Sequence, residues 1–227
     1  MKIDIITIFP NLFSNFLNES LLARAQKKKL ITITTHDLRR WTDDKHKTID
    51  DRPYGGGAGM VLKIEPIFRA VSAIGGSASG GKSKKSRVIL LSAKGKTFTQ
   101  KDAQRLAKYD QIIFICGRYE GVDERVAKHV ADEEISIGNY VLFGGEVPAM
   151  VIIETISRLI PGVVAKEESV KNESFSDKKA KTKEYPQYTR PEIFKMRGKK
   201  LKVPRVLLSG DHKKIEEWRK KHSIIYK

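Results

Sequence analysis

The chain contains 227 residues, with 44 lysines and arginines against 27 aspartates and glutamates, so its formal net charge is +17. This length suits one large or two small domains with a well-buried core, and folding needs no disulfide or structural metal. Cys116 is the single cysteine, which excludes an intramolecular disulfide. Because the apolar runs are far shorter than a membrane-spanning helix and no secretion signal is recognisable, we expect a cytoplasmic protein without a membrane partner.

The positive charge is concentrated towards the end of the chain. Residues 171–227 contain 18 basic and 7 acidic residues, whereas residues 1–170 contain 26 and 20. A polyanion such as a nucleic acid is the natural partner of such a segment, because each neutralised phosphate releases counterions. A lysine-rich surface without a specific partner explains the same charge, so composition alone leaves both interpretations open.

Hydrophobic periodicity predicts alternating strands and helices along most of the chain. In chain order we expect a strand at 2–8, helices at 12–17 and 20–29, a strand at 31–34, a glycine-rich loop at 36–60, a helix at 64–73, a linker at 75–86, a strand at 87–92, a helix at 99–108, a strand at 111–116, a helix at 122–130, a strand at 134–137, a helix at 147–159 and a last helix from Asp211. This alternation indicates an α/β fold with a mainly parallel sheet. A lysine-rich linker and a small helical segment are expected to follow the sheet.

Residues 76–83 match the phosphate-binding pattern G-x-x-x-x-G-K-[ST] in every position. That loop connects a strand to a helix, so that the N-terminus of the helix faces the phosphates. Here a predicted helix precedes the pattern and a predicted strand follows it. A linker rich in glycine, serine and lysine explains the match, and a phosphate-loop NTPase stays a minor alternative.

Glycine-rich segments follow three of the predicted strands, at 92–95, 116–121 and 136–145. In open α/β sheets, ligands bind beyond the carboxyl ends of the strands, so we expect these segments to converge on one small-molecule site. A fourth glycine-rich segment, residues 50–60, is interpreted as a ligand-contacting loop. The sequence has no G-x-G-x-x-G pattern, which argues against dinucleotide binding.

The acidic residues of the lysine-rich segment are candidates for a general base near a nucleic-acid site. They are Glu167, Glu168, Glu173 and Asp177. Residue type alone does not distinguish among them, and a solvated cluster of charges is the simpler interpretation. The residues thus predict an α/β protein with a glycine-lined pocket and a basic end that faces nucleic acid, but no particular reaction.

Ordered sequence motifs extend over nearly the whole chain. They comprise residues 5–10, 50–57, 59–60, 116–121, 123–125, 136–138, 140–142, 144–148, 160–162, 168–169, 174–175, 185–191 and 206–210. Together they resemble the bacterial tRNA (guanine-N1)-methyltransferase family TrmD, which belongs to the SPOUT methyltransferases. Motifs of this length, in this order, do not arise by chance.

The resemblance implies an α/β domain with a C-terminal trefoil knot that holds S-adenosylmethionine, followed by a small helical domain that binds tRNA. It also implies homodimers with the active site at the subunit interface, and methylation of N1 of guanosine at position 37 of tRNA. A magnesium requirement is implied, but the metal ligands are unknown. We therefore expect a cofactor-binding domain at 1–162, a flexible linker or lid at 163–186 and a helical domain at 187–227.

Matching the family motifs to this chain assigns roles to individual residues. His46, Asp50 and Gly59 match a loop that approaches the tRNA. Arg158 matches the arginine that positions the guanine, and Glu173 occupies the place of the catalytic carboxylate. The expected cofactor-binding residues are Leu91, Ser92, Gly117, Glu120, Ile137, Gly138, Asn139, Tyr140, Val141, Leu142, Gly144, Gly145 and Pro148.

Two departures from the family pattern affect these assignments. Glu173 replaces the usual aspartate before Ser-Phe, so its carboxylate extends about one methylene further and has one more torsion to order. Ala93 and Lys94 stand where Pro-Gln is usual, in a loop expected to contact the cofactor. A catalytically impaired RNA-binding protein of the same fold is therefore the alternative to an active methyltransferase.

Overall fold

The computed structural model describes residues 1–75, 85–165, 174, 182–183 and 185–225. The chain forms two compact units, residues 1–165 and residues 166–227, and each is described by itself. The phosphate-loop pattern, Glu173 and Asp177 lie outside the described residues. Within those residues, each helix is too short or too polar to cross a membrane.

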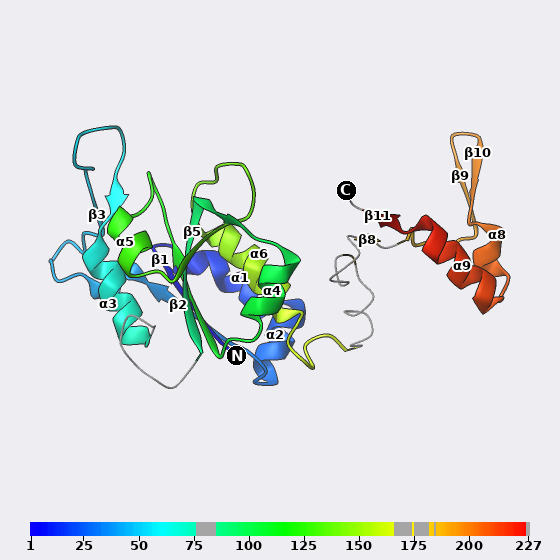
Figure 1. The fold of residues 1–227 in the computed structure, drawn as a ribbon, viewed down its shortest axis with the longest axis horizontal. Coiled ribbons are helices and arrows are strands. Elements are labelled where there is room, and N and C mark those ends of the chain that lie inside the picture. Colours follow the sequence, from blue (N-terminus) through cyan, green and yellow to red (C-terminus); the bar gives the residue numbers. More distant parts are fainter. Residues whose placement is uncertain (76–84, 166–173, 175–181, 184, 226–227) are drawn as a thin grey trace. The chain divides into compact units, whose positions relative to one another are not determined.

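A five-stranded parallel sheet forms the centre of the first unit (Figure 1). All six residues of its middle strand, β6, are buried, which explains why that sequence is almost continuously apolar instead of alternating. The predicted α/β fold with a mainly parallel sheet is confirmed. The strands are β1 (Lys2–Thr7), β2 (Thr32–Asp37), β5 (Ser86–Thr97), β6 (Gln111–Cys116) and β7 (Glu133–Ser136), in the order β2-β1-β6-β5-β7.

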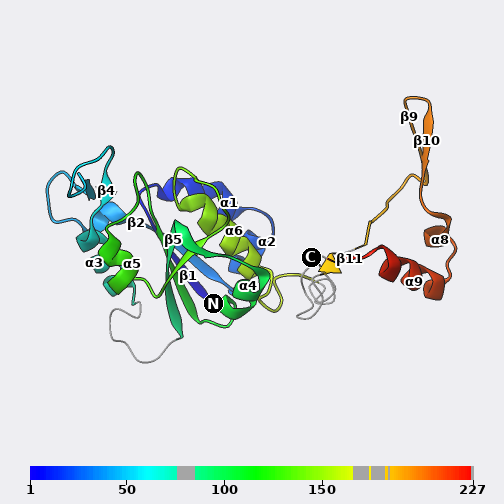
Figure 2. The same cartoon turned by 45° about the horizontal axis from the view of Figure 1, so that its top comes forward.

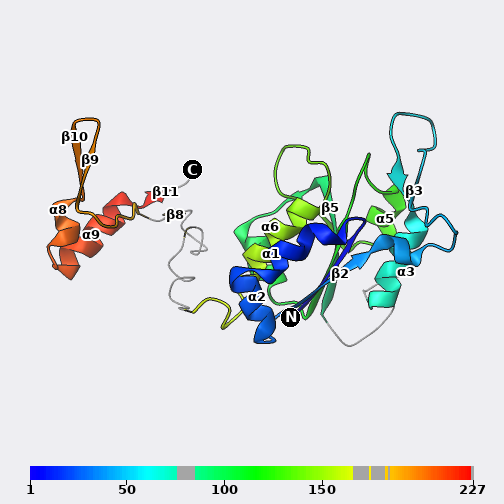
Figure 3. The ribbon, with the colours of Figure 1, turned by 180° about the vertical axis from the view of Figure 1, so that it is seen from behind.

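Helices cover both faces of this sheet (Figures 1, 2 and 3). One face carries η1 (Pro10–Phe13), α1 (Ser14–Asn18), α2 (Ser20–Lys27), α4 (Gln100–Leu106) and α6 (Glu146–Ser157), and the other carries η2 (Leu38–Trp41), α3 (Ile64–Ile74) and α5 (Glu124–His129). Phe114 of β6 packs into the apolar cluster on the first face, and its neighbour Ile113 packs into the cluster on the second. Successive side chains of a strand point to opposite faces, so one sheet serves two cores.

Strand β5 is longer than the sequence predicts. The apolar run predicts a strand at 87–92, whereas β5 continues for five more residues. Leu91 and Lys96 both pair with Ile135 of β7, so the residues between them bulge out of the ladder. A Cβ on Gly95 would lie 2.5 Å from the backbone nitrogen of Ile135, so the strand returns to β7 only because this position has no side chain. The predicted strand-end loop is therefore a bulge within a strand.

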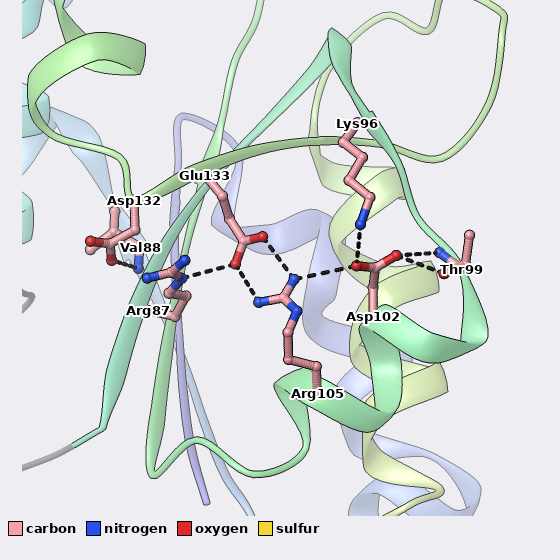
Figure 4. Close-up of polar contacts among 8 residues, drawn as sticks. All are labelled: Arg87, Val88, Lys96, Thr99, Asp102, Arg105, Asp132 and Glu133. Atoms are coloured by element: carbon pink, nitrogen blue, oxygen red, sulfur yellow. Dashed lines mark hydrogen bonds and ion pairs between the residues drawn. The ribbon is translucent and has the colours of Figure 1, made fainter. Parts of the chain in front are cut away.

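A polar network links α4 to β5 and β7 (Figure 4). Arg105 donates to both carboxylate oxygens of Glu133, at 3.0 and 2.8 Å, and Arg87 donates to the same carboxylate at 3.0 Å. Burial raises the pKa of Glu133, but the hydrogen bonds from these arginines outweigh it and hold that pKa below its usual value. Asp102 of α4 extends the network and accepts a hydrogen bond from Lys96 at 2.8 Å. The edge strand β7 and the returning end of β5 are thereby held against α4.

The second unit combines short helices with antiparallel strand pairs. Its helices are α8 (Arg205–Leu208) and α9 (His212–His222), and its strand pairs are β8 (Thr182–Lys183) with β11 (Ile224–Ile225) and β9 (Ile193–Met196) with β10 (Lys199–Lys202). The expectation of a helical domain missed the β9–β10 hairpin. Arg197 and Gly198 form its two-residue turn, with φ of +48° and +76°. Positive φ at both central residues is what a tight hairpin turn requires, so a glycine between alternating segments was the signal.

Candidate functional site

A pocket of about 220 Å³ opens at the bulge of β5 and at the carboxyl ends of β6 and β7. Its walls are the β5 bulge, the loop 117–122 after β6, and the segment 134–148 that leads from β7 into α6. The second and third walls are joined directly, because the Gly145 N–H donates to the Gly117 carbonyl oxygen at 2.9 Å. The three glycine-rich segments therefore meet at one pocket, as the sequence predicts.

Twelve of the thirteen expected cofactor-binding residues line this pocket. Asn139 is the exception. The structure brings these residues together, and their role in holding a cofactor stays a prediction. The twelve are Leu91, Ser92, Gly117, Glu120, Ile137, Gly138, Tyr140, Val141, Leu142, Gly144, Gly145 and Pro148.

Two adjacent glycines allow the pocket walls to approach each other. A Cβ on Gly145 would lie 2.7 Å from the Cα of Cys116, so a side chain there would push α6 away from β6. A Cβ on Gly144 would lie 2.5 Å from Cδ of Arg118 and 2.7 Å from Oε2 of Glu146. Close approach of backbone and side chains, and not a positive φ, is the reason that both positions exclude a side chain.

A buried ion pair lies behind these glycines. Glu146, the first residue of α6, is 1% exposed and accepts hydrogen bonds from Nε of Arg118 and from Oγ1 of Thr7, each at 2.8 Å. The Thr7 hydroxyl oxygen accepts a hydrogen bond from the Phe9 N–H at 2.9 Å, and the Arg118 guanidinium lies 4.8 Å from the Phe9 ring centroid. These contacts connect the end of β1, the loop after β6 and the start of α6.

The sequence reasoning missed this ion pair. An acidic residue in the first turn of a helix commonly stabilises the helix end, so the sequence did not indicate a further role for Glu146. The signal was its position between two glycines and an apolar helix, because a charged residue in apolar surroundings needs a partner. Arg118 lies within a recognised motif but received no role of its own.

The pocket carries charges of both signs. Lys94 forms an ion pair with Glu124 at 3.5 Å, but both side chains are well exposed, so the pair contributes little. Cys116 lies behind the wall, and burial raises the pKa of its thiol well above its usual value, so it stays a neutral thiol at pH 7. The charged residues of the lining are Lys94, Arg118, Glu120, Glu124 and Glu134.

This lining fits S-adenosylmethionine. Leu91, Ile137, Leu142 and Pro148 supply apolar walls suited to a planar adenine. Carboxylates in the lining, such as that of Glu120, complement the positive sulfonium. Two chemical features of the cofactor thus find counterparts among the residues present.

The 50–60 loop lies beside this pocket. Its base is a short antiparallel pair, β3 (Asp50–Asp51) with β4 (Val61–Leu62). Gly59 has a φ of +84°, and a Cβ there would lie 2.6 Å from Cγ of the pocket residue Glu120. Of the three residues expected to approach the tRNA, Gly59 therefore abuts the pocket, whereas His46 and Asp50 do not line it.

Arg158, one of the two expected catalytic residues, does not line the pocket of its own chain. Arg158 is exposed at the C-terminal cap of α6, whereas the pocket residue Pro148 lies near the other end of that helix. At 1.5 Å per residue, the intervening helix spans about 15 Å. Glu173 lies outside the described residues. Its assignment as the base stays a prediction.

The expected magnesium ion has no ligand set in the described part of the chain. There, no group of three or more His, Cys, Asp or Glu side chains is arranged to hold a metal ion. No step of the reaction is therefore derived through a metal.

A parallel α/β sheet with a glycine-lined pocket beyond three of its strands defines a class of proteins that bind a small molecule or cofactor at the C-terminal edge of the sheet. Comparison with known families gives a specific assignment. The family model described as "tRNA (Guanine-1)-methyltransferase TrmD" matches residues 1–226. The chain belongs to this family.

Proteins named tRNA (guanine-N(1)-)-methyltransferase are similar along nearly the whole chain. The one from Carboxydothermus hydrogenoformans is 53% identical over 225 residues, which cover 99% of this chain and 83% of that protein. The one from Anoxybacillus flavithermus is 52% identical over 224 residues, which cover 99% and 87%. The one from Bacillus subtilis is 49% identical over 224 residues, which cover 99% and 88%.

Proposed function

We propose that this protein transfers a methyl group from S-adenosylmethionine to N1 of guanosine at position 37 of tRNA. The observation that carries the proposal is the gathering of twelve residues from the family's cofactor loops around one pocket. Membership of the family and a relative named for this reaction at 53% identity support it.

Different residues of the chain bind the cofactor, remove the proton and stabilise the developing charge in this reaction. S-adenosylmethionine, when bound, supplies an electrophilic methyl group, and the three pocket segments hold it largely through main-chain groups. Guanine N1 carries a proton at neutral pH and is too weakly acidic to lose it unaided, so the protein must supply a base. We assign that role to Glu173, with Arg158 stabilising the negative charge that develops at O6 of the guanine.

A homodimer is part of the proposal because Arg158 does not line the pocket of its own chain. Arg158 lies at the far end of α6 from the pocket, about 15 Å along the helix axis. A second copy of the chain is needed to bring the same arginine to this pocket. Exposed apolar side chains near the pocket support an interface there, since soluble monomers rarely expose them in groups. They are Val141 and Phe143, which line the pocket, and Val147, which lies in sequence between the pocket residues Gly145 and Pro148.

The remaining features are inferred from family membership. We infer that the segment leading from β7 into α6 forms the trefoil knot, and its return to Gly117 through the Gly145 hydrogen bond is consistent with this. The basic second unit binds the tRNA, and its β9–β10 hairpin carries four exposed lysines. We propose that the protein acts in the cytoplasm, where its tRNA substrate is found. Magnesium participation is a further proposal, without an assigned site.

A methyl-transfer assay tests the proposed function. Purified protein and radiolabelled S-adenosylmethionine would be incubated with an unmodified tRNA transcript that carries guanosine at position 37. A transcript with adenosine at that position is the matched control, and primer extension locates the modified base. We expect label in the first transcript alone. Cofactor binding without any transfer would instead favour the catalytically impaired RNA-binding protein.

A further inference from the structure

The guanidinium of Arg118 is held in the pocket wall by one of its edges. Its Nε donates to the buried carboxylate of Glu146 at 2.8 Å, and its Cζ lies over the Phe9 ring, 4.8 Å from the centroid. The side chain is 20% exposed, and the residue lines the pocket. The position of this group is therefore determined by the fold before any ligand binds.

The other edge of this guanidinium has spare donors. An arginine carries five N–H donors in a fixed plane, and the single one at Nε serves Glu146. Within the described residues, the Nη1 and Nη2 atoms of Arg118 have no hydrogen-bond acceptor. The planar fork of donors matches a group with two oxygens, such as a carboxylate or a phosphate.

The surroundings favour a ligand group over bulk water as the partner. Glu146 offsets the positive charge at Nε, so Arg118 tolerates its low exposure without a second carboxylate from the protein. Lys94, the other cation of the lining, differs because its side chain is 78% exposed and pairs with Glu124. Arg118 is thus the one cation of the pocket lining, among the described residues, that is both constrained by buried contacts and supplied with spare donors.

We propose that Arg118 is an anion-binding residue of the pocket, and that Glu146 and Phe9 position it to bind a two-oxygen anion with Nη1 and Nη2. The proposal rests on the proposed function for the identity of the ligand. The two ligands of the proposed reaction each carry such an anion: S-adenosylmethionine has a carboxylate, and the tRNA has phosphates. The low exposure of Arg118 favours the carboxylate.

Decarboxylated S-adenosylmethionine, which lacks only that carboxylate, separates the two sources. Calorimetry would measure the dissociation constants of both compounds with the full chain. We expect the wild-type protein to bind S-adenosylmethionine about tenfold or more tightly than the analogue, which is the scale of one hydrogen bond between charged groups. Arg118→Gln should reduce this ratio to about one, and Arg118→Lys, which keeps the charge but lacks the planar fork of donors, should retain part of it.

Control variants separate this role from a structural one. Arg118→Gln leaves the Glu146 carboxylate buried and unpaired, so the double variant Arg118→Gln/Glu146→Gln removes both charges and should fold while also lacking discrimination. Lys94→Gln and Arg105→Lys should keep the full preference for the carboxylate. If Lys94→Gln abolished the preference instead, the assignment of the anion to Arg118 would be wrong.

A second measurement addresses the phosphate. If the anion is a phosphate, the affinity ratio stays unchanged in the Arg118 variants, and the slope of log K against log salt for tRNA binding becomes less steep by about one. If neither the ratio nor the slope changes, Arg118 binds no anion and the inference is overturned. A wild-type protein that failed to bind S-adenosylmethionine at all would contradict the proposed function, whereas binding without carboxylate discrimination or a slope change would contradict this inference alone.

Discussion

The two units of the chain differ in how they are stabilised. The first unit buries apolar side chains on both faces of its sheet, and Phe13 and Phe114 are fully buried there. In the second unit no side chain that the structure describes is buried, and Phe194 is 54% exposed. The charge differs as well, since residues 193–210 contain six basic and no acidic residues.

This difference indicates that the two units have different roles in the protein. A unit with two closed apolar layers holds a pocket in a defined shape without help from a ligand. A unit with half-exposed apolar groups and unbalanced positive charge gains stability and order when a partner covers it. We therefore expect changes in the first unit to affect folding and cofactor binding, and changes in the second to affect tRNA use and transfer. Four predictions test this expectation.

The largest expected effect is on the rate of methyl transfer, because we assign the general base to Glu173 in the second unit. Glu173→Gln keeps the shape of the side chain but cannot accept a proton, and loss of a general base costs about 10²–10⁴-fold in rate. Single-turnover methyl transfer should fall by that factor, while the dissociation constant for S-adenosylmethionine stays unchanged. Asp177→Asn is the matched control and should lose far less, and Glu173→Asp should remain active. If Asp177→Asn were inactive and Glu173→Gln were fully active, the general base would be Asp177 and not Glu173.

Phenylalanine truncation compares the two units directly. Phe114→Ala removes a fully buried ring from the first unit, and such changes cost about 3–5 kcal/mol in unfolding free energy. Phe194→Ala makes the same change at a half-exposed site of the second unit and should cost about 0.5 kcal/mol. Urea unfolding followed by tryptophan fluorescence reports on each unit when the other tryptophan is replaced with phenylalanine, because Trp41 lies in the first unit and Trp218 in the second. Equal losses would contradict the comparison.

The charge of the second unit is tested by four lysines of the hairpin. Replacing Lys195, Lys199, Lys200 and Lys202 with glutamine should weaken tRNA binding about tenfold or more and make its salt dependence less steep, by roughly 0.7–0.9 per lost phosphate contact. Binding of S-adenosylmethionine should not change. Filter binding over a salt series provides the measurement.

The matched control for the hairpin removes the same charge from the first unit. The control variant uses four exposed lysines of the first unit, Lys27, Lys28, Lys29 and Lys101. Their replacement with glutamine should weaken tRNA binding less than the hairpin variant does. If both variants weakened binding equally, net charge and not the second unit would account for the affinity.

The smallest effect concerns acid stability. Burial raises the pKa values of Glu133 and Asp102, but hydrogen bonds from Arg105, Arg87 and Lys96 outweigh it and lower both. Their contribution to stability is therefore complete above the unfolded pKa values of about 4 and is lost as the pH falls below them, by up to about 1.4 kcal/mol per pH unit for each proton taken up. Urea unfolding from pH 6 to 3 should give this slope in the first unit.

Glutamine variants identify the groups responsible for the acid slope. Glu133→Gln should make the slope of the first unit less steep between pH 5 and 3. Glu216→Gln removes an exposed carboxylate that pairs with Lys220 in α9, and should leave that slope unchanged. If Glu133→Gln left the pH slope of the first unit unchanged, other carboxyl groups would control its acid stability.

The sequence by itself determined the α/β class, the order of the five sheet strands and of the helices between them in the first unit, and the three glycine-rich segments. These features follow from local patterns: a buried strand is continuously apolar, an amphipathic helix repeats every 3.6 residues, and glycine marks places where the backbone needs space. The family motifs added the residues of the pocket, of which Asn139 alone does not line it.

Only the tertiary structure decided how distant segments meet. The continuation of β5 past Ser92 depends on pairing with β7, and the Arg118–Glu146 pair joins residues 28 positions apart. The distance between Arg158 and the pocket depends on the direction of α6. No local pattern encodes such contacts, because hydrogen bonding and burial between distant residues exist only after the chain has folded.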